Sequence, residues 1–274
     1  VIIVTFKTDI RILKNCLNSI DKTTKILIVE NSESFFHKKE IKEKFDNVEI
    51  VCTGSNLGMG AGNNFGFLKS KTDYALVLNP DIVCNNNFFT NIKKYLGDYD
   101  DYAIIGCQYL DNSIYKPAGY FSKQKNKNVS FENELTKVEW VVGCSMLFNL
   151  KKFKNKNIFD ENFFLFFEEF DLCRRVLNNG GKIFASKKLY VKHLGHKGSV
   201  AADPRHEKDS AFLRSWHWMW SSFYYYEKNF SYFYAIKCMY GKFFRSLIKM
   251  IYYRIFYNSI KFKMYYGRVC GIWN

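Results

Sequence analysis

The first third of the chain alternates short apolar runs with segments whose apolar residues have helical spacing. Four runs are predicted strands: VIIVTF (1–6), KILIVEN (25–31), NVEIVCTG (47–54) and YALVLNPDI (74–82). The first is a continuous β-branched run, as in a strand buried on both faces. RILKNCLNSI (11–20) and GAGNNFGFLKS (60–70) are predicted helices, the second entered through glycines. Strands that alternate with helices predict βαβ units and a mainly parallel sheet.

The ends of these predicted strands carry the first candidate site residues. In a parallel sheet, the loops after the carboxyl ends of the strands form the ligand crevice. We therefore expect one edge of the sheet to gather the residues found at those ends: Thr5, Phe6, Glu30, Asn31 and Asp81.

The pattern changes in the rest of the chain. From about residue 104 the predicted strands are shorter, and GKIFASKKLYVKHLG (181–195) is predicted to be a pair of strands. Residues 228–274 contain no Asp or Glu, and their basic and aromatic residues have the spacing of a basic amphipathic helix. Two alternatives are open for this helix: it packs by its aromatic side and is otherwise solvated, or it docks on an anionic membrane.

Composition narrows the class of protein. The 274 residues are 47% hydrophobic, enough for a substantial core, and the net charge of +15 favours anionic partners such as nucleotide diphosphates, lipid headgroups or nucleic acid. The eight cysteines include no CxxC pair and no secretory leader precedes them, which predicts reduced core thiols in a cytosolic protein. No apolar run approaches the roughly 20 residues of a spanning helix.

The glycine-rich segment SNLGMGAGNNFG (55–66) is the first motif with candidate chemistry. Its glycines allow close backbone approach, and Asn56, Asn63 and Asn64 supply amide groups before and within a helix. Free N–H groups at a helix start suit an anion. The alternative is a flexible turn followed by an ordinary helix.

The Asn-Pro-Asp sequence at 79–81 ends the fourth predicted strand on a carboxylate. Pro80 restricts the backbone, so Asp81 is well placed for a hard cation such as Mg²⁺ or Mn²⁺, although such an ion needs further ligands. The alternative is a simple turn. The motif VKHLGHKGS (191–199) adds His193 and His196, which are either structural residues or ligands that complete such a site.

Acidic residues crowd the segment FDENFFLFFEEFDLCRRVLNNGG (159–181). Its phenylalanines recur at helical spacing, and the predicted helix places Glu168, Glu169 and Asp171 within one turn of each other. One interpretation is a set of acids at a helix start with Asp171 paired to Arg175. The other is a general base, because burial among phenylalanines and the like charges of the three carboxylates should raise the pKa of at least one of them.

In this order, the motifs resemble those of the family-2 inverting glycosyltransferases with the GT-A fold, and most closely the rhamnosyltransferase-like enzymes of bacterial surface polysaccharide and lipopolysaccharide synthesis. The similarity covers about the first 200 residues. It implies an α/β nucleotide-diphospho-sugar transferase fold, with a mainly parallel central sheet flanked by helices. The change in composition after residue 202 adds a helical, basic C-terminal extension. The expected boundaries are 1–202 for the catalytic domain, with a nucleotide-binding half (1–103) and an acceptor half (104–202), and 203–274 for the extension.

The resemblance also implies a role for each matching residue. Thr5, Phe6, Glu30 and Asn31 would line the base and ribose of the donor, with Glu30 standing where the family usually has Asp. Asn79 and Asp81 match the Asp-x-Asp metal motif of the family, in a form with Asn first, so Asp81 would be the main ligand of Mg²⁺ or Mn²⁺. His193 would contact the metal or the diphosphate. Glu169 would be the base that deprotonates the acceptor hydroxyl, with Glu168 and Asp171 as alternatives. Asn56, Gly58 and Asn63 would shape the donor pocket, and Trp140 and Gly143 would face the sugar or the acceptor.

The implied reaction moves a sugar, L-rhamnose as the first candidate, from a dTDP- or UDP-sugar to a glycan or polyprenyl-linked saccharide. We expect a cytoplasmic enzyme that contacts the inner face of the cytoplasmic membrane peripherally. Two rival hypotheses are a basic nucleic-acid-binding protein, which leaves Asp81 and the acidic cluster without a role, and a sugar nucleotidyltransferase, which would release pyrophosphate.

Overall fold

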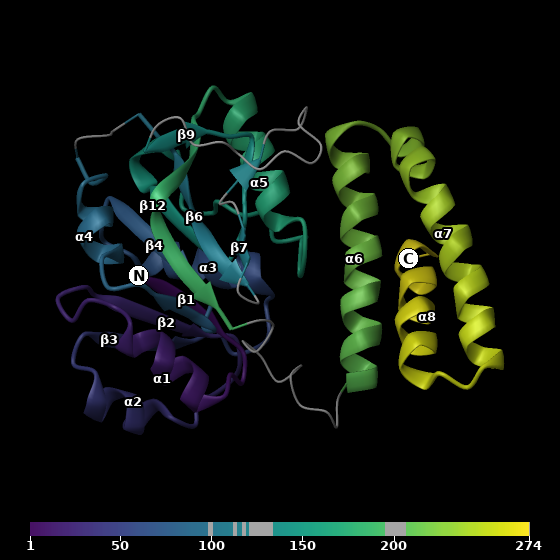
Figure 1. The fold of residues 1–274 in the computed structure, drawn as a ribbon, viewed down its shortest axis with the longest axis horizontal. Helices are drawn as coiled ribbons and strands as arrows, with labels where there is room; N and C mark the ends of the chain where they lie inside the picture. Colours follow the sequence, from purple (N-terminus) through teal and green to yellow (C-terminus); the bar gives the residue numbers. More distant parts are fainter. Residues whose placement is uncertain (98–100, 112–113, 117–118, 121–133, 195–206, 274) are drawn as a thin grey trace.

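The computed structural model describes residues 1–97, 101–111, 114–116, 119–120, 134–194 and 207–273. Figure 1 shows a sheet with helices packed around it and, beside it, the long C-terminal helices. The central sheet has the strand order β3-β2-β1-β4-β11-β6-β12-β5, with β7 and β9 at its margins. Its strands are β1 (Ile2–Thr5), β2 (Ile26–Glu30), β3 (Val48–Cys52), β4 (Tyr74–Leu78), β5 (Ile82–Cys84), β6 (Ile104–Asp111), β7 (Ile114–Lys116), β9 (Leu135–Lys137), β11 (Ser145–Asn149) and β12 (Ile183–His193).

The sheet has a parallel half and a mixed half. Strands β3, β2, β1 and β4 run parallel, as predicted, and their register pairs Thr5 with Glu30 at the ends of β1 and β2. Beyond β4 the prediction of a mainly parallel sheet fails, because β11 is antiparallel to both β4 and β6, while β12 is parallel to β6 and antiparallel to β5. The short strands β8 (Gly119–Tyr120) and β10 (Trp140–Val141) form a separate antiparallel pair.

Two apolar layers cover the sheet, one on each face. Alternate residues of β1 divide between them: Ile3 packs with one layer, and Ile2 and Val4 pack with the other. The first layer contains buried residues of α1 (Ile10–Asn18), α2 (Lys38–Lys44) and α4 (Phe88–Lys93). The second contains those of α3 (Met59–Lys69) and α5 (Glu168–Asn178). The predicted helices α1, α3 and α5 are therefore present, whereas α2 and α4 were not foreseen.

Two local predictions were wrong. Residues 181–195 do not form a pair of strands, because β12 is one strand that shifts register against β6 between Ser186 and Tyr190. The aromatic segment before the acids is not helical, because Phe166 and Phe167 have φ of +68° and +69° and α5 begins only at Glu168.

The C-terminal part consists of α6 (Glu207–Asn229), α7 (Tyr232–Ile255) and α8 (Ser259–Trp273), with α6 against the sheet-containing part and α7 on the far side (Figure 1). The predicted tail helix is thus confirmed as α7, followed by α8. The predicted boundary at 202/203 and His196 lie outside the described residues. Among the helices that the structure describes, none combines the length and apolar character needed to cross a membrane. Five of the eight cysteines are buried as free thiols, as expected for core residues: Cys16, Cys84, Cys107, Cys144 and Cys173.

Candidate active site

A cavity of about 700 Å³ opens where β1 and β2 end. This volume lies in the usual range for small-molecule pockets. Among the residues predicted to contact the donor, Phe6, Glu30, Asn31 and Asn56 line the cavity. The other lining residues are Lys7, Thr8, Ser32, Glu33, Ser34, Phe35, Phe36, His37, Gly54 and Ser55.

Glu30 is the buried polar centre of this cavity wall, with 1% of its surface exposed. Its carboxylate accepts hydrogen bonds from the Thr5 hydroxyl at 2.5 Å, the Ser32 hydroxyl at 2.6 Å and the Lys7 backbone N–H at 3.1 Å. Lys7 reaches this position with a φ of +48°, which is uncommon for a residue other than glycine. Thr5 therefore supports Glu30 from behind the cavity and is not among the lining residues.

The glycine-rich segment brings α3 close to its neighbours. Gly58 has a φ of +84°, and a side chain there would collide with the backbone carbonyl of Phe164. Within the helix, a Cβ at Gly62 would lie 2.8 Å from Val4 Cγ1, so glycine permits tight packing of α3 on β1. The Asn31 side-chain N–H donates to the Gly58 carbonyl at 2.8 Å and fixes the start of the helix beside the cavity.

The asparagines of this segment do not line the cavity together. Asn63 donates to the carbonyl of Met59 within its own helix, and its Oδ1 is buried without a hydrogen-bond partner among the described residues. Asn64 instead accepts from the backbone N–H groups of Ile158 and Phe159 at 2.9 and 2.8 Å. It thereby ties α3 to the segment that leads into α5, a structural role that the sequence analysis missed. Anion binding at this segment stays a prediction.

The Asn-Pro-Asp corner is a tight turn that presents Asp81 next to a histidine. The Ile82 N–H donates to the Asn79 carbonyl at 3.2 Å, with Pro80 in the position that favours such turns. Antiparallel pairing of β5 and β12 sets His193 opposite Ile82, and His193 Nε2 lies 3.4 Å from Asp81 Oδ2. The two residues predicted as metal ligands are therefore brought together, and the turn and cation interpretations of Asn-Pro-Asp are compatible.

The chemistry of this pair suits a divalent cation that shares its ligands with a diphosphate. A carboxylate and an imidazole are ordinary ligands of Mn²⁺, and Mg²⁺ commonly uses one or two carboxylates together with phosphate oxygens and water. In the part of the chain that the structure describes, no group of three or more His, Cys, Asp or Glu side chains is arranged to hold a metal ion. Asp81 and His193 would thus supply two ligands of such an ion.

The acidic helix α5 places Glu168 and Glu169 in different surroundings. Glu168 packs toward α3, where its Cβ lies 3.7 Å from the position of a Cβ added at Gly60, and its Oε2 is buried with no hydrogen-bond partner among the described residues. Burial and then the charge of Glu169 raise the pKa of Glu168 to about 8. Burial raises the pKa of Glu169 to about 7. A carboxylate that titrates near neutral pH is suited to act as a general base.

Glu169 lies beside the residues predicted to face the sugar or acceptor. Its Cδ is 3.6 Å from the position of a Cβ added at Gly143, so a side chain at Gly143 would press on the carboxylate. The ring of Trp140 packs on that of Phe170, the next residue of α5, with 4.5 Å between centroids. Gly143 is therefore next to Glu169, and Trp140 is next to Phe170, while their predicted contacts with the sugar or acceptor stay predictions.

The backbone at Gly143 and Cys144 connects the two halves of the candidate site. The Cys144 carbonyl accepts a hydrogen bond from the Asn79 N–H at 3.0 Å, while Gly143 lies against Glu169. Burial, Cys107 and the charges of Asp81 and Glu169 raise the pKa of the Cys144 thiol, so both carboxylates lie within electrostatic reach of one side chain. The corner that carries Asp81 and the helix that carries Glu169 thus converge.

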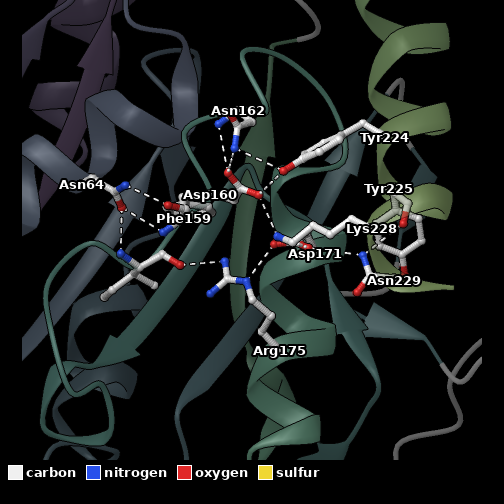
Figure 2. Close-up of polar contacts among 11 residues, drawn as sticks. Asn64, Phe159, Asp160, Asn162, Asp171, Arg175, Tyr224, Tyr225, Lys228 and Asn229 are labelled. Carbon is white, nitrogen blue, oxygen red and sulfur yellow. Dashed lines mark hydrogen bonds and ion pairs between the residues drawn. The ribbon is translucent and has the colours of Figure 1, made fainter. Parts of the chain in front are cut away.

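Asp171 has a different environment and forms part of an ion-pair network with α6 (Figure 2). Its side chain is fully buried and is bound by Arg175 Nε at 2.7 Å and Lys228 Nζ at 2.8 Å. Lys228 also contacts Asp160 at 2.6 Å, and Tyr224 donates to Asp160 at 3.1 Å. The predicted Asp171–Arg175 pair is present, but the contacts from Lys228 could not be foreseen from spacing in the sequence.

Comparisons with known proteins agree with the mixed α/β fold that the structure describes. The chain is similar to TarS of S. aureus in complex with UDP-GlcNAc, with a TM-score of 0.54 and 12% identity over 99% of this chain and 89% of that one. It is 25% identical to the rhamnosyltransferase WbbL of Escherichia coli K12 over 76% of this chain and 83% of WbbL. It is 21% identical to the dTDP-rhamnosyl transferase RfbF of Shigella flexneri, over 65% of this chain and 63% of RfbF.

The sequence pattern of the family described as Glycosyl transferase family 2 matches residues 1–171. The chain therefore belongs to glycosyl transferase family 2. The predicted family and the GT-A-type α/β fold with a C-terminal helical part are confirmed. The roles of individual site residues stay predictions.

Proposed function

We propose that the chain is an inverting, metal-dependent glycosyltransferase, which moves a sugar from a nucleotide diphosphate to an acceptor hydroxyl. One observation carries this proposal: the Asp81 corner and Glu169 converge on the same backbone segment, Gly143–Cys144. A reaction of this class needs a diphosphate-binding group and a base within the width of one sugar. The arrangement supports that requirement.

On the donor side, the cavity lined by Phe6, Glu30, Asn31 and Asn56 would receive the nucleotide. Asp81 and His193, 3.4 Å apart, would hold Mg²⁺ or Mn²⁺ at the diphosphate. A bound cation supplies charge stabilisation to the departing diphosphate. The buried Glu30, already held by three donors, would present a fixed wall to the base and ribose.

On the acceptor side, Glu169 would take the proton from the attacking hydroxyl. Its pKa of about 7 lets a substantial fraction be ionised at neutral pH, when it can accept that proton. Attack on the face opposite the leaving diphosphate inverts the anomeric configuration. Glu168 is the alternative base, whereas the ion pairs of Asp171 with Arg175 and Lys228 favour a positioning role for that residue.

We further propose dTDP-L-rhamnose as the first donor to test and a glycan or polyprenyl-linked saccharide as the acceptor, in surface polysaccharide synthesis. The names of the relatives WbbL and RfbF support the choice of rhamnose. Such an acceptor would place the enzyme at the inner face of the cytoplasmic membrane.

A binding experiment tests the donor side directly. We expect dTDP and UDP to raise the Tm of the protein more in the presence of Mn²⁺ than in its absence, because a bound ligand stabilises the folded state. Asp81→Ala should remove the Mn²⁺-dependent part of the shift, and the exposed control Asp46→Ala should keep it. Equal shifts with and without Mn²⁺ in the unsubstituted protein would contradict metal-assisted donor binding.

A product assay separates the rival functions. With a sugar nucleotide, Mn²⁺ and a polyprenyl-linked saccharide, the proposed enzyme releases a nucleoside diphosphate. A nucleotidyltransferase would release pyrophosphate from a nucleoside triphosphate and a sugar phosphate instead. A nucleic-acid-binding protein would release neither product.

A further inference from the structure

Helix α7 has apolar residues on two opposite sides. On one side Ala235, Met239 and Ser246 are buried against the other C-terminal helices. On the opposite side runs a second row of large apolar residues, which we call the α7 stripe. Its members, with exposed fractions from 39% to 81%, are Phe233, Ile236, Tyr240, Phe244, Ile248, Ile251 and Ile255.

The spacing of the α7 stripe makes it one continuous surface. Its residues follow one another at intervals of three or four, which puts them on one side of a helix. At 1.5 Å per residue, the row from Phe233 to Ile255 is about 33 Å long. Monomeric proteins seldom expose so extended an apolar surface, and those that do use it to bind a partner or a membrane. In Figure 1, α7 lies on the side of α6 away from the sheet, and the α7 stripe is exposed in the part of the chain that the structure describes.

The charges around the α7 stripe indicate what binds there. Residues 228–274 contain nine lysines and arginines and no Asp or Glu. Lys237 and Arg245 are exposed on α7 itself. Lys242 and Lys249 are exposed as well, and their Nζ atoms lie 5.7 and 5.4 Å from the ring centroids of Tyr226 and Tyr265, on the neighbouring helices α6 and α8.

These charges favour a lipid surface over a second copy of the chain. Two copies packed stripe to stripe would oppose cations to cations, without a carboxylate from either tail to compensate. An anionic bilayer instead offers hydrocarbon to the apolar side chains and negative headgroups to Lys237 and Arg245. The α7 stripe thus combines the two attractions that bind amphipathic helices in the plane of a membrane.

We propose that the α7 stripe docks on the surface of an anionic membrane, with α7 parallel to the bilayer plane. This inference rests on the proposed function in one respect: docking would help the enzyme only if its acceptor is linked to a lipid. Docking itself needs neither donor nor acceptor. Vesicle binding can therefore fail while donor binding succeeds, and the reverse.

The experiment is sedimentation of the full chain with vesicles of phosphatidylcholine and phosphatidylglycerol (7:3), or of phosphatidylcholine alone. We expect stronger binding to the anionic vesicles. The double variant Ile248→Ser/Ile251→Ser should bind at least about tenfold more weakly, because it removes two large apolar groups from the interface. Leu68→Ser, an equally exposed leucine on α3, is the matched control and should bind normally.

A second variant tests the electrostatic part without changing the apolar surface. Lys237→Gln/Arg245→Gln should weaken binding to anionic vesicles by about 25-fold, at about fivefold per charge, and should leave binding to neutral vesicles unchanged. The proposal is overturned if the unsubstituted chain does not sediment with anionic vesicles. It is overturned as well if both double variants bind these vesicles as strongly as the unsubstituted chain. It is also overturned if light scattering shows a dimer that Ile248→Ser/Ile251→Ser dissociates.

Discussion

Lys228→Met tests whether the C-terminal helices hold the acidic helix in place. In the folded protein the Lys228 ammonium makes two charge-assisted hydrogen bonds, at 2.6 Å to Asp160 and 2.8 Å to Asp171. Burial opposes the charged form of Lys228, but these two bonds raise its pKa overall. Each such bond contributes about 1.5–3 kcal/mol. Asp171 keeps its bond to Arg175, and Lys228 is partly exposed, so we expect a net loss of about 2–4 kcal/mol in the free energy of unfolding.

The assay is urea-induced unfolding followed by circular dichroism, with Lys208→Met on the same helix as the exposed control. We expect the control to differ from the unsubstituted protein by less than about 0.5 kcal/mol. A double-mutant cycle with Asp160→Asn should give a coupling energy of at least about 1 kcal/mol, because the two groups share one contact. If Lys228→Met unfolds at the same urea concentration as the control, the network does not attach α6 to α5 in solution.

Two further predictions concern the carboxylates of α5. Glu169→Gln should keep donor binding but slow sugar transfer by about 10² to 10⁴, the usual contribution of a positioned base, and normal turnover would move the base elsewhere. In the unsubstituted enzyme, kcat should rise with pH through about 7. The pKa of Glu168 is raised to about 8, so its protonated form contributes stability that is complete below about pH 4.5 and is lost as the pH rises through about 8. Between pH 5 and 7, the free energy of unfolding should therefore fall less for Glu168→Gln than for the unsubstituted protein, by on the order of 1–3 kcal/mol in urea unfolding. If the two proteins lose the same stability over this pH range, Glu168 does not titrate there.

Local patterns in the sequence were sufficient for the parallel half of the fold. The apolar runs of β1, β2 and β4 are buried on both faces, whereas β3 at the edge of the sheet buries mainly Val48 and Ile50. Such runs can be recognised in the sequence without knowledge of distant contacts. Beyond β4 the local signal was weaker. The register shift between Ser186 and Tyr190 made one strand resemble two, because periodicity is interrupted where a bulge adds residues.

The candidate site was predictable where motifs lie at strand ends, and less so where distant segments meet. Asp81 and His193 were both identified, but their 3.4 Å approach depends on the pairing of β5 with β12. The start of α5 was predicted too early. The helical spacing of the phenylalanines does not reveal that Phe166 and Phe167 adopt a left-handed backbone conformation. Both rings contact Trp218 of α6, a tertiary interaction that overrides the local pattern.

The segment Gly143–Cys144 has a consequence for how an enzyme of this shape can diversify. Because the Asn79 N–H donates to the Cys144 carbonyl and Glu169 packs against Gly143, one short piece of main chain sets the distance between the Asp81 corner and Glu169, the proposed places of the leaving group and the base. Any rearrangement there would disturb both ends of the reaction at once. Residues 33–37 line the cavity but lie outside this segment. Substitutions there can therefore change the shape of the cavity without moving the Asp81 corner relative to Glu169.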